Sequence, residues 1–224
     1  FHSIQYMADI IRHLPQMRGY DVVQVTNPVF FDLRPEKNWA IFKYLKKHNK
    51  KIFLDALAID HYYVKACLDG KTFRYSDFFV GDRPLPHPER EKMLAAWIGG
   101  PNERPNIEMA QEANGIIACL YEYYAAYQPE YADKLAYIPI PIDLSINPFH
   151  PIKSTPEVVK FFIGIQQHRT AIKGTDILLD VLREIHDKYP RESHIQKVVS
   201  VPFDEYNKLL VDCHILLDQL YSYT

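Results

Sequence analysis

The stretch that decides the fold lies at residues 161–176 and reads FFIGIQQHRTAIKGTD. Its first four residues are apolar and predict a buried strand, a polar loop follows, and Gly174 comes directly before a predicted helix. A strand that leads through a short loop into a helix is the first half of a βαβ unit. Ligands of open α/β sheets bind at the carboxyl ends of the strands, which is where this loop lies.

The residues of this loop are suited to a diphosphate. Arg169 can hold phosphate oxygens with two hydrogen bonds, and Lys173 adds a point charge. Gly164 and Gly174 would let the backbone approach a ligand closely. The start of the helix contributes free N–H groups and the positive end of its dipole. The alternative is that Arg169 and Lys173 are solvated loop charges, as is common in loops.

The same alternation of short apolar runs and helical periods extends on both sides of this stretch. It predicts an α/β protein whose parallel sheets are covered on both faces. A proline-containing segment at 143–157 interrupts the pattern and predicts a linker between an N-terminal domain, 1–147, and a C-terminal domain, 148–224. Strands are expected at 20–25, 51–57, 115–120, 135–140, 158–164, 195–199 and from 215, with helices at 38–47, 176–188 and after Asp204.

Composition limits the class of protein. The 224 residues are 47% hydrophobic and 24% charged, with a formal net charge of -2, so no overall attraction to nucleic acid is expected. Three widely separated cysteines fit reduced thiols in a cytoplasmic protein, and no Cys/His spacing indicates zinc. The chain opens at Phe1 in mid-pattern, so the start of the first domain is expected to be missing.

A second candidate site follows the strand predicted at 51–57. His61 could donate a hydrogen bond to a sugar or to a departing phosphate, and Asp60 could orient it, so both are catalytic candidates. The alternative is a helix start, with Asp60 as its N-cap and the following aromatic residues packed beneath it.

Two further clusters have a binding interpretation and a structural one. The tyrosine-rich run at 121–127 could stack on sugars or a base, but packing is the favoured interpretation. The basic run at 43–51 could face a membrane, but a solvated helix end is favoured.

Three segments of the C-terminal half resemble the donor domain of family 4-like glycosyltransferases of the GT-B fold, of the bacterial type. They are KGTDILL at 173–179, VPFDEY at 201–206 and CHILLD at 213–218. The resemblance covers 158–224, and Arg169 and Lys173 correspond to the basic pair that grips the nucleotide diphosphate. Gly164 and Arg169 stand five positions apart here, whereas the family has Gly-Arg together.

The resemblance implies two Rossmann-like domains with a cleft between them, the N-terminal one on the acceptor side. It implies retaining transfer from a nucleotide-diphospho-sugar to a sugar or lipid-linked acceptor in polysaccharide biosynthesis, with no metal or other cofactor. A lipid-linked acceptor would bring the protein into peripheral contact with a membrane. The acidic residues that hold the donor sugar would follow Thr224, so the donor domain is expected to be incomplete.

The same residues are also compatible with two other classes of protein. A nucleotide-sugar 2-epimerase shares the fold and the grip on the diphosphate, and a non-catalytic sugar-binding protein can also have two α/β lobes. No carboxylate pair of the kind that a glycosidase needs is evident in the sequence.

Overall fold

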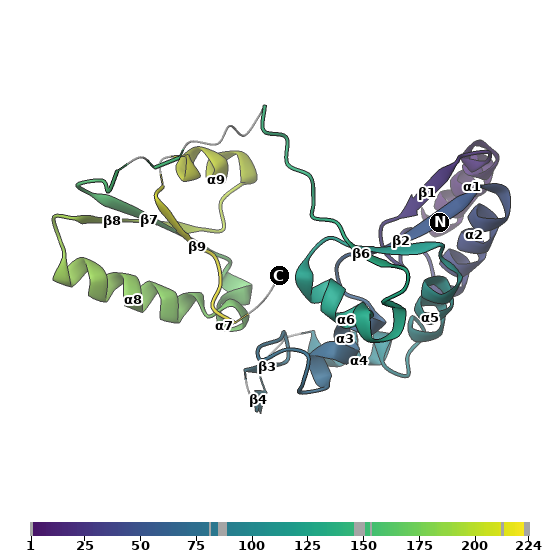
Figure 1. Cartoon of the computed structure of the whole chain (residues 1–224), viewed down its shortest axis with the longest axis horizontal. Helices are drawn as coiled ribbons and strands as arrows, with labels where there is room; N and C mark the ends of the chain where they lie inside the picture. The colour runs from purple at the N-terminus through teal and green to yellow at the C-terminus, as the bar shows by residue number, and fades with distance from the viewer. Residues whose placement is uncertain are drawn as a thin grey trace. The chain divides into compact units, whose positions relative to one another are not determined.

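The computed structural model describes residues 2–80, 82–84, 89–145, 151–152, 154–211 and 213–221. The chain forms two compact units (Figure 1). The first comprises residues 1–73 and 88–141, and the second comprises 74–87 and 142–223. The domain boundary predicted at 147/148 lies outside the described residues, and the predicted first domain includes 74–87, which belongs to the second unit. Among the described helices, none is both long and apolar enough to cross a lipid bilayer.

The first unit is built on a four-stranded parallel sheet in the order β1-β2-β5-β6. Its strands are β1 (Val22–Val25), β2 (Lys51–Ala56), β5 (Gly115–Ala118) and β6 (Leu135–Tyr137). Its helices are α1 (His2–His13), the short 3-10 helix η1 (Leu14–Met17), α2 (Pro35–His48), α3 (His61–Leu68), α4 (Arg90–Trp97), α5 (Glu103–Glu112) and α6 (Tyr121–Tyr131).

Local sequence explains why α2 forms where it does. Pro35 occupies the first turn, where its missing N–H costs nothing, and Glu36 follows it. Lys46, Lys47 and His48 lie in the last turn, where positive charge interacts favourably with the helix dipole. The helix buries Ile41, Phe42 and Leu45.

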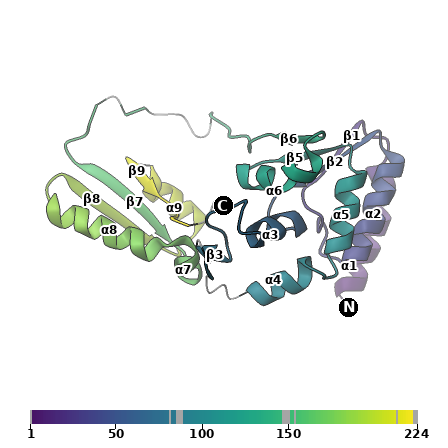
Figure 2. The same ribbon diagram turned by 60° about the horizontal axis from the view of Figure 1, so that its bottom comes forward.

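The helices of this unit cover one face of the sheet (Figure 2). Neighbouring strands follow one another in chain order, so right-handed crossovers place every connecting helix on the same side. The buried row Val25, Leu54 and Ile116 runs across the sheet in register. On the other face, Val22 is 55% exposed. The expectation that both faces are covered is therefore wrong for this sheet, because the strand order has no reversal.

The second unit contains a three-stranded parallel sheet in the order β8-β7-β9. Its strands are β7 (Val159–Ile165), β8 (Ser193–Val199) and β9 (Ile215–Leu217), and a separate antiparallel pair is formed by β3 (Phe79–Val80) and β4 (Arg83–Pro84). Its helices are η2 (Gln167–Arg169), α7 (Thr170–Lys173), α8 (Thr175–Lys188) and α9 (Phe203–Leu210).

The chain reverses direction across this second sheet. From central β7 it moves to β8 on one side and then returns to β9 on the other. Because both crossovers are right-handed, α8 and α9 lie on opposite faces (Figure 1). The carboxyl ends of β7 and β9 therefore flank a topological switch point, the place where open α/β sheets bind ligands.

Candidate functional site

A cavity of about 420 Å³ lies at the carboxyl edge of the β8-β7-β9 sheet. The ends of all three strands contribute to it, together with α7 and α9. We call it the switch-point pocket, and its lining residues are Gly164, Ile165, Gln166, Lys173, Val198, Ser200, Val201, Tyr206 and Asp218. It therefore lies at the position that the strand order predicts for a ligand.

Lys173 supplies the positive charge of the switch-point pocket. Its side chain is 11% exposed, and its Nζ donates to Asp218 Oδ1 at 3.0 Å. Its backbone oxygen accepts a hydrogen bond from Leu220 N at 2.7 Å, which ties the end of α7 to the segment after β9. The ammonium group is thus held in place before any ligand arrives.

The first turn of α8 lies next to Lys173 in the chain. Gly174, with φ of 65°, ends α7 and is the N-cap of α8, and it provides no side chain to cap the free N–H groups. Thr175 is fully buried, and its hydroxyl has no hydrogen-bond partner among the described residues. An uncapped helix start beside a lysine favours an anion.

Tyr206 of α9 forms one wall of the switch-point pocket. Its ring packs edge-on against Phe162 at a centroid distance of 5.0 Å and lies over Gly164. A Cβ at Gly164 would come within 2.9 Å of Tyr206 Cε2 and 3.1 Å of its Oη. Burial raises the pKa of Tyr206, and the negative charge of Asp218 raises it further, so the phenol is a hydrogen-bond donor at neutral pH.

Gly164→Ala is expected to destabilise the second unit by about 1–3 kcal/mol, because the added methyl group overpacks the ring of Tyr206. Urea unfolding of Gly164→Ala, Tyr206→Ala and the double variant measures this. The double variant should lose less stability than the sum of the two single losses, since the clash is then gone. Additive losses would show that Gly164 and Tyr206 do not interact.

Backbone strain marks the carboxyl edges of both sheets. Two described residues other than glycine have positive φ: Ser200 at 47° and Ala58 at 66°. Ser200 directly follows β8, lines the switch-point pocket, and donates its N–H to Ile165 O at 3.1 Å. Ala58 follows β2 and lines a second cavity of about 390 Å³. Such conformations are costly and concentrate at functional sites.

The predicted diphosphate residues are only partly brought together. Gly164 and Lys173 line the switch-point pocket. Arg169 ends η2 with an exposed side chain and is not among the lining residues. Gly174 is not among them either, and its small size serves packing, since a Cβ there would meet Leu220 and Tyr221 at 3.0 Å.

Asp60 and His61 lie in the first unit, inside a buried hydrogen-bond network. Asp60 is the N-cap of α3: it accepts from Tyr63 N at 2.8 Å and from the hydroxyl of Tyr127 at 2.7 Å. His61 Nδ1 lies 2.9 Å from Trp97 O. Neither residue lines the switch-point pocket or the cavity at Ala58. This geometry favours the helix-start interpretation, and their catalytic role stays a prediction.

Tyr127 of the tyrosine-rich run also belongs to the hydrogen-bond network around Asp60. Burial, followed by the charge of Asp60, raises the pKa of Tyr127 well above its usual value. Asn106 Nδ2 donates to the same hydroxyl at 3.3 Å. Tyr123 and Tyr127 are both buried, as the packing interpretation predicts. Tyr121 is 67% exposed and Tyr124 is partly exposed, so these two members of the run remain open to a ligand.

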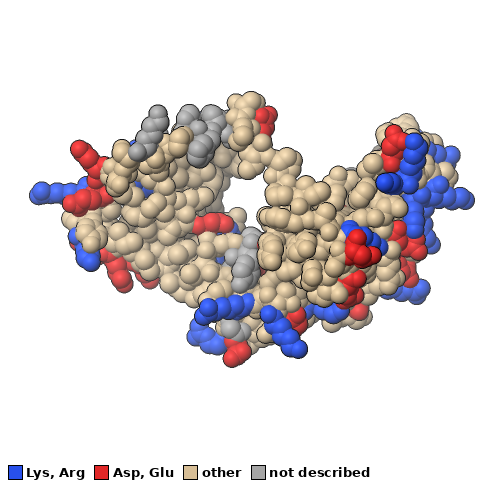
Figure 3. Space-filling view, viewed as in Figure 1, with Lys and Arg blue, Asp and Glu red and all other residues tan. Residues whose placement is uncertain are grey.

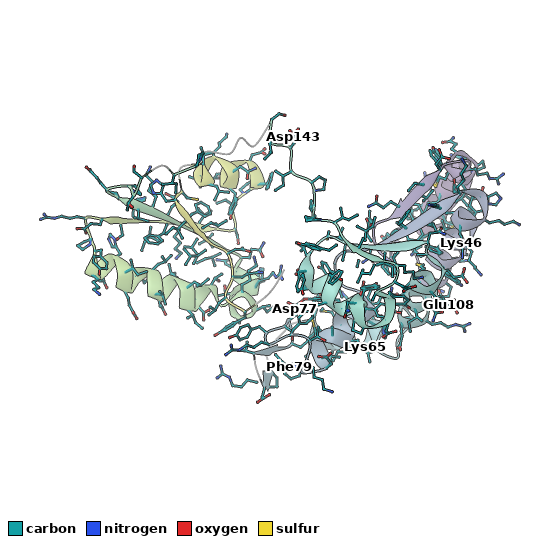
Figure 4. All side chains as sticks on the ribbon, in the orientation of Figure 1. Lys46, Lys65, Asp77, Phe79, Glu108 and Asp143 are labelled. Atoms are coloured by element: carbon teal, nitrogen blue, oxygen red, sulfur yellow. The ribbon has the colours of Figure 1, made fainter. Side chains whose placement is uncertain are left out.

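The basic run at 43–51 carries ordinary surface charges. Lys46 on α2 forms an ion pair with Glu112 on the neighbouring helix α5, and Lys50 pairs with Asp21. Lys46 and Glu108 mark these two helices in Figure 4. In Figure 3, Lys and Arg gather at the right-hand end of this unit, with Asp and Glu beside them. The favoured interpretation as a solvated helix end fits this arrangement.

Asp218 and Tyr206 line the switch-point pocket but were not predicted as site residues. Asp218 directly follows β9, so the rule that pointed to the loop after β7 could also have found Asp218. Tyr206 ends the VPFDEY segment that resembles the donor domain, but its place in the pocket depends on how α9 packs over Gly164.

No protein-family model matches this chain, and no curated protein matches it.

Proposed function

We propose that the protein is a glycosyltransferase that transfers a hexosyl unit from a nucleotide-diphospho-sugar to a sugar or lipid-linked acceptor. In this proposal the two units are Rossmann-like domains of the GT-B architecture. The second unit binds the donor, and the first serves the acceptor.

The observation that carries the proposal is the position of Lys173 at the switch point of the second sheet. The lysine projects into a cavity of about 420 Å³, and the next residues form the uncapped start of α8. A diphosphate fits this combination because an ammonium group and a helix N-terminus both stabilise negative charge. Gln166, Ser200 and Tyr206 add polar groups for the phosphate or ribose oxygens.

The same residues suit the chemistry of transfer. As the bond between the sugar and the diphosphate breaks, negative charge grows on the diphosphate oxygen that leaves. Lys173 already lines the pocket and is held by Asp218, so its ammonium group need not reorganise during the reaction. Arg169 is the N-cap residue of α7 and is proposed as a second, outer contact to the nucleotide.

The test is an incubation of the protein with UDP-glucose or GDP-mannose and n-octyl β-glucoside as acceptor. We expect a new glycoside together with an equal amount of free nucleoside diphosphate, measured by mass spectrometry and a coupled enzyme assay. An epimerised donor without a new glycoside would instead identify an epimerase. Binding of the nucleotide-sugar with neither product would identify a sugar-nucleotide binding protein and contradict the proposal.

A further inference from the structure

The switch-point pocket contains an internal ion pair. Lys173 and Asp218 are its only charged lining residues among those described, and their side-chain atoms lie 3.0 Å apart. The lysine is 11% exposed, whereas the aspartate is 57% exposed. The pocket is therefore electrically neutral, and a carboxylate lies next to the group that would hold a phosphate.

The Lys173–Asp218 pair is expected to affect the affinity of two kinds of ligand in different ways. A ligand that is anionic throughout would gain from Lys173 but would also bring its charge close to Asp218, and close like charges are unfavourable. A phosphate joined to a sugar can place a hydroxyl group on that side. A carboxylate is a strong acceptor for a hydroxyl donor, so the same residue would then contribute a charge-assisted hydrogen bond.

Asp218 is also well placed to act on the ligand. It directly follows β9, so it lies at the carboxyl edge of the sheet beside the end of β7. Its exposure leaves its second oxygen open to a ligand, while Lys173 occupies the first. Its charge also acts on the hydroxyl of Tyr206 across the pocket.

We propose that Asp218 determines the specificity of the switch-point pocket, favouring a phosphate that carries a hydroxyl-bearing sugar over a wholly anionic ligand such as inorganic pyrophosphate. This inference rests on the proposed function, since it takes the pocket to be the donor site. Specificity of this kind arises from repulsion of the wrong ligand as much as from attraction of the right one.

Calorimetric titration with UDP-glucose and with inorganic pyrophosphate tests the proposal, in the presence of EDTA so that no divalent cation bridges carboxylate and phosphate. Asp218→Asn removes the charge, and Asp218→Ala also removes the acceptor. Asp187→Asn makes the same charge change at an exposed position near the end of α8. We expect the preference for UDP-glucose over pyrophosphate to fall at least tenfold in Asp218→Asn, further in Asp218→Ala, and to be unchanged in Asp187→Asn.

The possible results distinguish a failure of the Asp218 inference from a failure of the proposed function. If the wild-type protein binds UDP-glucose and both Asp218 variants change the two affinities by the same factor, Asp218 does not discriminate, and the proposed function stands. If the wild-type protein binds neither ligand, the donor site is wrong and the inference fails with it. Circular dichroism confirms that each variant is folded before its affinity is compared.

Discussion

Lys173→Met is expected to weaken the binding of UDP and GDP by about 1.5–3 kcal/mol, or roughly 10- to 150-fold in Kd. The substitution keeps the length of the mostly buried stem, so the packing of α7 should survive. It removes the cation and leaves Asp218 unpaired in the same pocket, which adds repulsion to the loss of attraction. Isothermal titration calorimetry of the purified protein measures the change.

Lys188→Ala is the matched control for Lys173, because it removes an exposed lysine at the opposite end of α8. It should leave both affinities within experimental error. Arg169→Ala tests the outer contact and is expected to cost less than Lys173→Met, since Arg169 is exposed and does not line the switch-point pocket. Unchanged binding in Lys173→Met would remove the diphosphate from this pocket.

Asp60→Ala is expected to lower the free energy of unfolding by about 2–4 kcal/mol. It removes the N-cap of α3, and it leaves the hydroxyl of Tyr127 without its carboxylate acceptor in the core. Thermal and urea unfolding measure the loss, with Asp133→Ala at an exposed position as the control. A fall in turnover of the folded fraction, beyond the fall in stability, would instead support the predicted catalytic role.

The protonation of Asp60 should also make the free energy of unfolding depend on pH. Burial raises the pKa of Asp60 to about 6, above the value of about 3.9 expected in the unfolded chain. The free energy of unfolding that the protonated carboxyl contributes is therefore greatest below pH 4. It is lost as the pH rises through 6. Compared with Asp60→Asn, the wild-type protein should lose up to about 3 kcal/mol over that range. A flat difference would mean that Asp60 is not buried in solution.

Much of the secondary structure could be predicted from local sequence. The strands at 51–57, 115–120 and 158–164 appear as β2, β5 and β7 with small shifts at their ends. These runs are mostly apolar, and a strand buried in a parallel sheet leaves such a pattern. Helices α1, α4, α5 and α6 were not predicted. Of these, α4 and α5 are polar on much of their surface and bury few residues, so their periodicity is weak.

The candidate site was harder to predict, because burial decides which polar residues are available. Asp60 and His61 come shortly after a strand, as Lys173 does, but α5 and α6 cover them. The residue that pairs with Lys173 is 45 positions away in the chain. Such a partner can be identified only when the strand order is known.

The sequence by itself determined the α/β class, the strand-loop-helix unit at 161–176 and the lysine that follows this loop. These features depend on local patterns of apolar residues, glycine and charge, which act within one or two turns of chain. The tertiary structure decided that the first sheet is covered on one face, that the second reverses at β7, and that Asp218 meets Lys173. Those outcomes depend on which distant strands pair, because neighbours across a sheet are brought together by long-range packing.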